Sequence, residues 1–217
     1  INQAFMSKAM ARLAGRFQAL FDEVIAAAPP SGEIDLLKAV TIPFSASVIS
    51  EMLGVPPEDR ARFEDWHRLF GPIIGASLDD RSKYDMLADG VSELTSYVRE
   101  LMARYRDDPQ DNLLSELLKA RDDADALSED EVIATCTLVL FAGSETTANL
   151  IGNAILALLR HPDQMSLMRS GKADVANAVE EFLRYDGSGK AVTRVVRHAT
   201  DVLGVPMTTG QRAFLFL

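Results

Sequence analysis

The chain has 217 residues, enough for one sizeable domain, and its 47% apolar and 25% charged composition is typical of a globular protein in water. The formal net charge of −10, without any Lys/Arg-rich run, argues against a nucleic acid as partner. A single cysteine, Cys136, excludes an intramolecular disulfide, and the three histidines form no metal-ligand spacing.

The longest mostly apolar run, 132–142, is too short for a membrane span, which needs roughly 18 residues. No signal peptide opens the sequence. We therefore expect no membrane span and a cytoplasmic location, which the absence of disulfides also fits. The sequence starts at Ile1 and ends in the apolar run 213–217, whereas termini are normally polar. We expect the fold to be incomplete at both ends and this last run to need a partner strand.

Apolar residues recur at steps of three and four along much of the chain and predict helices over 5–25, 34–53, 56–70, 84–105 and 113–119. Ser128 and Glu131 form a capping-box pattern that opens a long helix over about 128–160, which His161-Pro162 ends. Such a helix is about 50 Å long and must cross the molecule. Shorter helices are predicted over 164–168 and about 174–185, and strands from about 191. The expected fold is mainly α with a small β-sheet portion, in a single domain over 1–217.

The centre of the long helix combines three local penalties in an otherwise apolar segment. Gly143 costs about 1 kcal/mol relative to alanine in a helix, the Glu145 carboxylate is costly to bury, and Thr146 can bond back to the carbonyl four residues earlier. A helix that is apolar all round is expected to be buried. The functional interpretation is a helix opened on one face, where Ala142 and Gly143 admit a flat ligand and Glu145 and Thr146 act as a proton relay. The structural alternative is a kinked core helix whose polar residues satisfy one another, and this turn alone leaves both open.

Glu181 and Arg184 form the sequence's Glu-x-x-Arg pattern. Residues three apart share a helix face, so the two side chains can form an ion pair. By itself the pattern is weak, because a surface helix carries such pairs routinely.

Taken together and in this order, Ala-Gly-x-Glu-Thr-Thr at 142–147 and Glu-x-x-Arg at 181–184 resemble the cytochrome P-450 family. Gly-Val-Pro-Pro-Glu-Asp at 54–59, Leu-Leu-Arg-His-Pro at 158–162 and Val-Glu-Glu-Phe-Leu-Arg-Tyr at 179–185 look similar to the same family, above all to its bacterial members. The resemblance covers essentially the whole chain.

The resemblance implies a role for each matching residue. Glu145 and Thr146 would be the catalytic acid–alcohol pair that delivers protons during oxygen activation, and Glu181 and Arg184 would be a structural ion pair beside the haem. Cofactor contacts would come from Ala142, Gly143, Thr147 and Arg194, with Arg194 pairing a haem propionate. The substrate pocket would be lined by Leu138, Phe141, Ala191 and Val192.

The resemblance further implies haem b as cofactor, a small organic substrate, O2, and electrons from a ferredoxin and ferredoxin reductase. The product would carry one oxygen atom from O2. The family's axial cysteine lies in a loop after the Glu-x-x-Arg helix, and these 217 residues do not contain that loop, so we expect no metal ligand in the chain and an inactive fragment if it stands alone. The alternative is a non-catalytic helical protein that binds a ligand or partner on a truncated scaffold of this kind.

Overall fold

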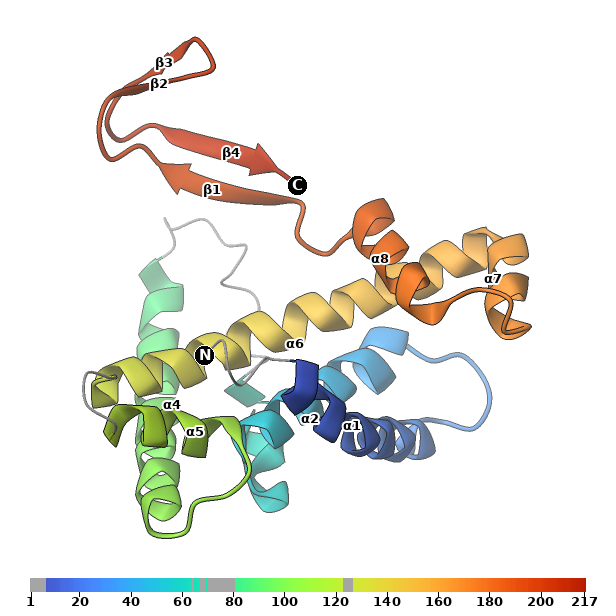
Figure 1. The fold of residues 1–217 in the computed structure, drawn as a ribbon, viewed down its shortest axis with the longest axis horizontal. Helices are drawn as coiled ribbons and strands as arrows, with labels where there is room; N and C mark the ends of the chain where they lie inside the picture. The colour runs from blue at the N-terminus through green and yellow to red at the C-terminus, as the bar shows by residue number, and fades with distance from the viewer. Residues whose placement is uncertain (1–6, 64, 67–68, 70–80, 123–126) are drawn as a thin grey trace. The chain divides into compact units, whose positions relative to one another are not determined.

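The computed structural model describes residues 7–63, 65, 66, 69, 81–122 and 127–217. The chain divides into two compact units, Ile1–Gly152 and Asn153–Leu217. The described residues are mainly helical, with a small amount of antiparallel sheet near the end of the chain, as the sequence predicts (Figure 1). That residues 1–217 form a single domain stays a prediction.

The first unit is built from helices. In chain order its elements are α1 (Ser7–Ala27), the π-helix η1 (Leu37–Thr41), α2 (Ile42–Leu53), the 3-10 helix η2 (Pro57–Asp59), α4 (Arg81–Asp107), α5 (Leu113–Asp122) and most of α6 (Glu129–Arg160). In the segment predicted as a helix over 56–70, residues 60–63, 65 and 66 are helical after η2, and 64, 67, 68 and 70 lie outside the described residues.

The segment predicted as one helix over 34–53 contains a π turn. Residues 37–41 form η1, in which the Ile42 N–H donates to the Leu37 carbonyl, five residues earlier, before α2 continues as a regular α-helix. Pro43 accounts for the change, because proline has no N–H and its ring clashes with the carbonyl four residues earlier in an α-helix. A wider turn just before Pro43 accommodates that ring without ending the helix.

The core of the first unit lies between α2, α4, α5 and the first half of α6. Its most enclosed large side chains are Phe63, Leu94, Met102, Leu114, Val132 and Leu140. The prediction that α6 is buried on all sides is wrong for this chain. Val132, Cys136 and Leu140 are buried on one face, whereas the Leu138 side chain is 60% exposed on another. The packing partners present cover only one face of this apolar helix.

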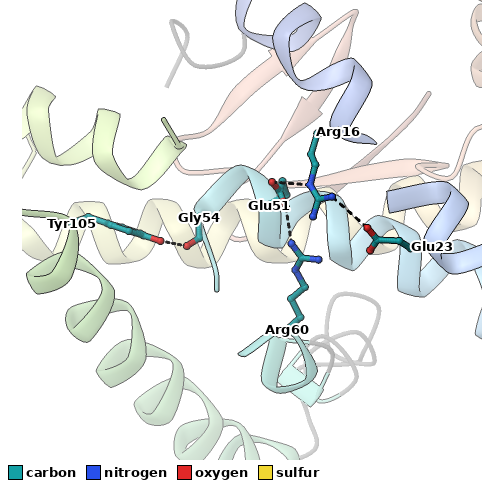
Figure 2. A network of polar contacts seen from close by, with 6 residues as sticks. All are labelled: Arg16, Glu23, Glu51, Gly54, Arg60 and Tyr105. Atoms are coloured by element: carbon teal, nitrogen blue, oxygen red, sulfur yellow. Dashed lines mark hydrogen bonds and ion pairs between the residues drawn. The ribbon is translucent and has the colours of Figure 1, made fainter. Parts of the chain in front are cut away.

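A network of charged and polar side chains surrounds the end of α2 (Figure 2). The Glu51 carboxylate accepts from Arg16 of α1 at 3.1 Å and from Arg60 at 2.6 Å, and Arg16 also pairs with Glu23 at 3.4 Å. The Tyr105 hydroxyl of α4 donates to the carbonyl of Gly54, the residue that caps α2. Both arginines and Glu51 are shielded from solvent to some extent, so this network ties α1, α2 and the segment after η2 together more firmly than a fully exposed pair would.

The second unit contains the end of α6, α7 (Pro162–Arg169), α8 (Val175–Asp186) and four short strands, β1 (Ala191–Val195), β2 (Thr200–Val202), β3 (Val205–Met207) and β4 (Arg212–Phe216). Asp174 caps α8 by accepting from the Asn177 N–H at 3.0 Å. β1 pairs with β4 in antiparallel register, Ala191 opposite Phe216, and β2 pairs with β3 (Figure 1). The apolar run at 213–217 therefore has the partner strand that it was expected to need.

Across the described part of the chain, none of the helices combines the length and the apolar character that crossing a membrane requires.

Gly54 provides a test of the turn that ends α2. It has a left-handed φ of 81°, and a Cβ there would lie 2.1 Å from the Asn112 amide nitrogen. Gly54→Ala is expected to lower the free energy of unfolding by about 2–4 kcal/mol, because backbone strain and overpacking add. Gly32→Ala is the matched control. Gly32 also has positive φ but no neighbour within 4 Å, so it should show only the strain, about 1 kcal/mol. Equal losses in urea unfolding would contradict the contact with Asn112.

Candidate functional site

α6 begins at the capping box that the sequence indicates. The Glu131 N–H donates to the Ser128 hydroxyl at 3.2 Å, and the Glu131 carboxylate accepts from the Ser128 N–H at 2.7 Å. The Ser128 N–H, and then the Ser128 hydroxyl, which donates to the same carboxylate at 2.9 Å, hold the pKa of Glu131 below its usual value. From this start α6 runs without interruption through residues 142–147 to Arg160. Residues 142–147 therefore belong to the same unbroken helix that begins at the capping box.

Gly143 lies on the face of α6 that packs against α2. A Cβ at Gly143 would be only 2.3 Å from Cδ1 of Ile49, so the glycine is accounted for by helix packing. Its neighbour Ser144 is fully buried and donates to the Leu140 carbonyl at 2.8 Å. Gly143 therefore has two explanations: it opens the helix to a flat ligand, as the sequence suggested, or it allows α6 to pack closely on Ile49. The helical glycine indicated a close approach, but nothing in the sequence identified Ile49 as the neighbour.

A different face of α6 is exposed in this chain and carries much of the predicted site. Leu138, Ala142 and Thr146 follow one another at four-residue spacing, and all three are exposed. Phe141 is half-buried and Thr147 is exposed beside them. The result is a stripe of small and apolar side chains with a single hydroxyl at Thr146, which we call the open stripe (Leu138, Ala142 and Thr146).

Thr146 makes the back-bond that the sequence suggests. Its Oγ1 donates to the Ala142 carbonyl at 2.7 Å, and the side chain is exposed. The hydroxyl proton is held by the helix, while the oxygen lone pairs remain available to accept. A proton can therefore reach this hydroxyl from outside the helix, with the Ala142 carbonyl fixing the orientation of the group.

Glu145 faces different surroundings from its neighbour Thr146. The side chain is half-buried, and its Oε2 is shielded from solvent and has no hydrogen-bond partner among the described residues. An unpaired buried carboxylate oxygen is costly and calls for a partner. The acid and the alcohol are thus adjacent in sequence, but one carboxylate oxygen points into the protein while the hydroxyl lies on the open stripe.

Glu181 and Arg184 form a bidentate ion pair on α8, with both nitrogen–oxygen distances at 2.7 Å. Arg184 lowers the pKa of Glu181, and Glu181 raises the pKa of Arg184, so both stay charged at neutral pH. Within this chain the side chains are 55% and 71% exposed, respectively. The pair exists as a local feature of α8, and its role in bracing a haem pocket stays a prediction.

The remaining predicted residues lie on β1. Successive strand residues point to opposite faces, so Val192 and Arg194 share one face and Ala191 lies on the other. Arg194 is exposed, and its guanidinium donates to the Thr193 carbonyl at 3.0 Å. The cation is available for an anionic ligand, and Val192 is better placed than Ala191 to line a pocket next to it.

The second unit also contains a groove with a cavity volume of about 440 Å³, between the last turns of α6, α7 and α8. Leu158, Met168 and Phe182 give it an apolar lining, and Glu181 reaches it from α8. At one side His161 Nε2 lies 3.3 Å from the Tyr185 hydroxyl. The groove therefore places Glu181 next to an apolar surface.

Metal ligation is not supported by the described residues. They contain no cluster of three or more His, Cys, Asp or Glu side chains that could hold a metal ion. Cys136, the one thiol of the sequence, is buried in the core of the first unit, and burial raises its pKa to about 12. A protonated thiol enclosed by apolar side chains is unsuited to bind iron.

The model of the cytochrome P-450 family matches residues 65–170. Cytochrome P-450 CYP107DY1 of Priestia megaterium is 38% identical over 86% of this chain and 44% of its own length. The vitamin D(3) 25-hydroxylase of Pseudonocardia autotrophica is 37% identical over 100% of this chain and 52% of its own. The ligand-free structure of cytochrome P-450 TbtJ1 superposes with a TM-score of 0.90 at 29% identity, over 98% of this chain and 56% of that one.

The chain belongs to the cytochrome P-450 family, as the ordered motifs indicate. It spans about half the length of the curated relatives that it matches.

Cys136 should be chemically silent in the folded protein. Because burial keeps the thiol protonated, we expect no reaction with a thiol-specific reagent at pH 8 within minutes, and one equivalent after addition of denaturant. The reaction in the folded and in the denatured protein is measured from the absorbance of the coloured group that the thiol reagent releases. Rapid labelling without denaturant would show that α6 opens near Cys136.

Proposed function

We propose that this chain forms part of a haem-dependent monooxygenase that inserts one oxygen atom from O2 into a small organic substrate. The observation that carries the proposal is the open stripe of α6, where an exposed, oriented hydroxyl stands at the end of an apolar surface in the segment that the family model covers. One relative, the vitamin D(3) 25-hydroxylase of Pseudonocardia autotrophica, is named for a hydroxylation. The particular substrate is left open.

The residues of this chain suit some of the contacts that haem b requires, but not the iron ligand. The open stripe is exposed and apolar except for the Thr146 hydroxyl, which suits one face of a flat macrocycle, and Leu138, Ala142, Gly143 and Thr147 are candidates to contact it or the substrate. The exposed guanidinium of Arg194 suits a propionate. Cys136 does not suit the iron, so the thiolate ligand is proposed to come from outside the 217 residues.

When bound, haem supplies the oxygen-activating redox chemistry. The residues of this chain would supply protons and positioning. Thr146 Oγ1, held by the Ala142 carbonyl, would accept a proton from a donor and pass it toward the open stripe. Glu145 would be the acid that renews that proton, through its carboxylate. Phe141, Val192 and Ala191 would bound the space for substrate, and the Glu181–Arg184 pair would brace the fold beside the cofactor.

Electrons would come from a ferredoxin and its reductase, in the cytoplasm. This part of the proposal rests on the likeness to bacterial relatives.

Thr146→Ala tests the relay in the complete, haem-loaded protein. We expect the variant to keep haem and substrate binding but to divert electrons to hydrogen peroxide, because the proton is no longer delivered from an oriented hydroxyl. Product formed per reduced cofactor consumed should fall several-fold, and Thr146→Ser should restore much of it.

Thr137→Ala is the matched control for this test. Thr137 makes the same type of back-bond, to the Ile133 carbonyl at 2.8 Å, on the same helix. Its removal should leave the ratio of product to peroxide unchanged. An equal loss in both variants would assign the effect to helix stability and remove Thr146 from the relay.

Arg184→Ala tests the charged pair of α8. If the pair braces the haem pocket, the purified variant should contain little haem. The reason is that the Glu181 carboxylate loses both hydrogen bonds from Arg184, and the pocket loses the ion pair that supports it. Lys190→Ala is the control, since Lys190 pairs with Asp186 on the surface of the same unit. Haem content is read from absorbance per protein. Full haem in both variants would make the Glu181–Arg184 pair an ordinary surface feature.

A further inference from the structure

One polar side chain in the second half of α6 has an unfavourable position for its type. Asn153 stands between Ile151 and Ile155, and asparagine is a poor residue for a helix interior because its amide competes with the backbone for hydrogen bonds. Asn153 follows Thr146 by seven residues on one unbroken helix, which returns it to the same helix face about 10 Å farther along the axis. The face that carries Thr146 therefore ends in a second polar group.

The Asn153 amide has a defined partner at the end of α8. Its Nδ2 donates to the Asp186 carbonyl at 2.8 Å, and both residues are half-buried. Asp186 is the last residue of α8, and the last four carbonyls of an α-helix have no N–H partner within their own helix. Asn153 thus provides from α6 a donor that α8 cannot provide for itself, which accounts for a polar residue at this position.

The chain makes a tight corner directly after this carbonyl. A Cβ at Gly187 would lie 2.6 Å from the Leu183 carbonyl oxygen, so the backbone passes close to the last turn of α8. Lys190, just before β1, is already joined to the end of β4, since its carbonyl accepts from the Leu217 N–H at 3.1 Å. Only residues 187–189 therefore separate the carbonyl held by α6 from the first hydrogen bond of the sheet.

A second interaction at the same corner is more exposed to solvent. The Lys190 ammonium pairs with the Asp186 carboxylate, and these side chains are 63% and 42% exposed, respectively. Water screens ion pairs that are exposed to this extent, and such pairs often contribute little. A hydrogen bond that is partly removed from water is electrostatically stronger. We therefore regard the hydrogen bond from Asn153 as the interaction that fixes the corner.

We propose that Asn153 is a positioning residue for the substrate side of the site. Its amide holds the end of α8 on α6 and so fixes where the chain enters β1, whose second residue is Val192. Without this donor the start of β1 would shift, and Val192 would lose its fixed place relative to α6. That Val192 lines the substrate space rests on the proposed function, whereas the hydrogen bond itself does not.

Hydrogen exchange in the complete, haem-loaded protein tests the corner without any activity. Asn153→Ala should speed the exchange of the amides of β1 and of Leu217 several-fold, because the carbonyl at the corner is released. Asn153→Asp keeps the shape of the side chain but loses the donor, and it should show the same change. Unchanged exchange in these variants would show that the amide does not hold the corner and would overturn the proposal.

Gln164→Ala is the matched control for the exchange experiment. Gln164 is also an amide side chain of the second unit, and its Nε2 donates at 2.8 Å to the exposed Asp163 carboxylate. Its removal should leave the exchange rates of β1 unchanged. Equal acceleration in the control would assign the effect to general loosening of the unit and would also overturn the proposal.

Two iron-binding probes of different size test the positioning role. Imidazole and 4-phenylimidazole both bind haem iron through a ring nitrogen, but only the second places a phenyl ring in the substrate space. Both affinities are measured from the shift of the Soret band. Asn153→Ala and Asn153→Asp should weaken binding of 4-phenylimidazole several-fold and leave the imidazole affinity and the haem content unchanged. With Val192→Ala already present, Asn153→Ala should weaken 4-phenylimidazole less, because the side chain that it positions has been removed.

The outcomes separate this role from others. Equal weakening of both probes, or loss of haem, would assign Asn153 to cofactor binding and overturn its role on the substrate side. Faster exchange with unchanged binding of both probes would overturn that role as well, and so would an undiminished effect of Asn153→Ala beside Val192→Ala. If the complete protein takes up no haem, the proposed function fails, while the exchange result still decides whether Asn153 holds the corner. The two failures are therefore distinguishable.

Discussion

The close contact between Gly143 and Ile49 is the constraint on which the candidate site depends. Without a side chain at position 143, the face of α6 that carries it can approach α2 closely. This contact fixes the rotation of α6 about its axis, because every other residue of the helix follows at 100° steps. It buries Ser144 and Ala148 and leaves Leu138, Ala142 and Thr146 outside. A larger residue at 143 would first have to displace the Ile49 side chain, whose Cδ1 is the nearest atom.

The same packing separates the acid from the alcohol. Residues 145 and 146 are 100° apart on the helix, so their side chains have different surroundings. Thr146 satisfies its hydroxyl on the Ala142 carbonyl, and Glu145 keeps one buried oxygen unpaired. A local penalty of this kind at a candidate site is expected where function outweighs stability. At the other end of α2, the Glu51 carboxylate is paired with Arg16 and Arg60, and the Gly54 carbonyl accepts from Tyr105 (Figure 2).

Much of the local structure was readable from the sequence. The capping box at Ser128 and Glu131, the stop at His161-Pro162 and the apolar spacing predicted the long helix to within a residue or so of Glu129–Arg160. These signals are local: they depend on side chains three or four positions apart. The same holds for the ion pair of Glu181 and Arg184, one turn apart on α8. The family assignment also followed from the order of short motifs, and the comparisons with known proteins agree with it.

Other features depend on contacts between distant segments, and the sequence could not show them. The long helix looked buried on all sides because it is apolar nearly all round, yet Leu138 on it is exposed, since burial depends on which helices pack nearby. Thr41 and Ser45 lie in the segment predicted as a helix over 34–53, but nothing local revealed that their hydroxyls are enclosed without a hydrogen-bond partner among the described residues. The sequence by itself determined the helices, their caps and the family, because these follow from neighbouring residues. Only the tertiary structure decided which face of α6 is open and which polar atoms are buried, because both are set by how helices from distant parts of the chain pack.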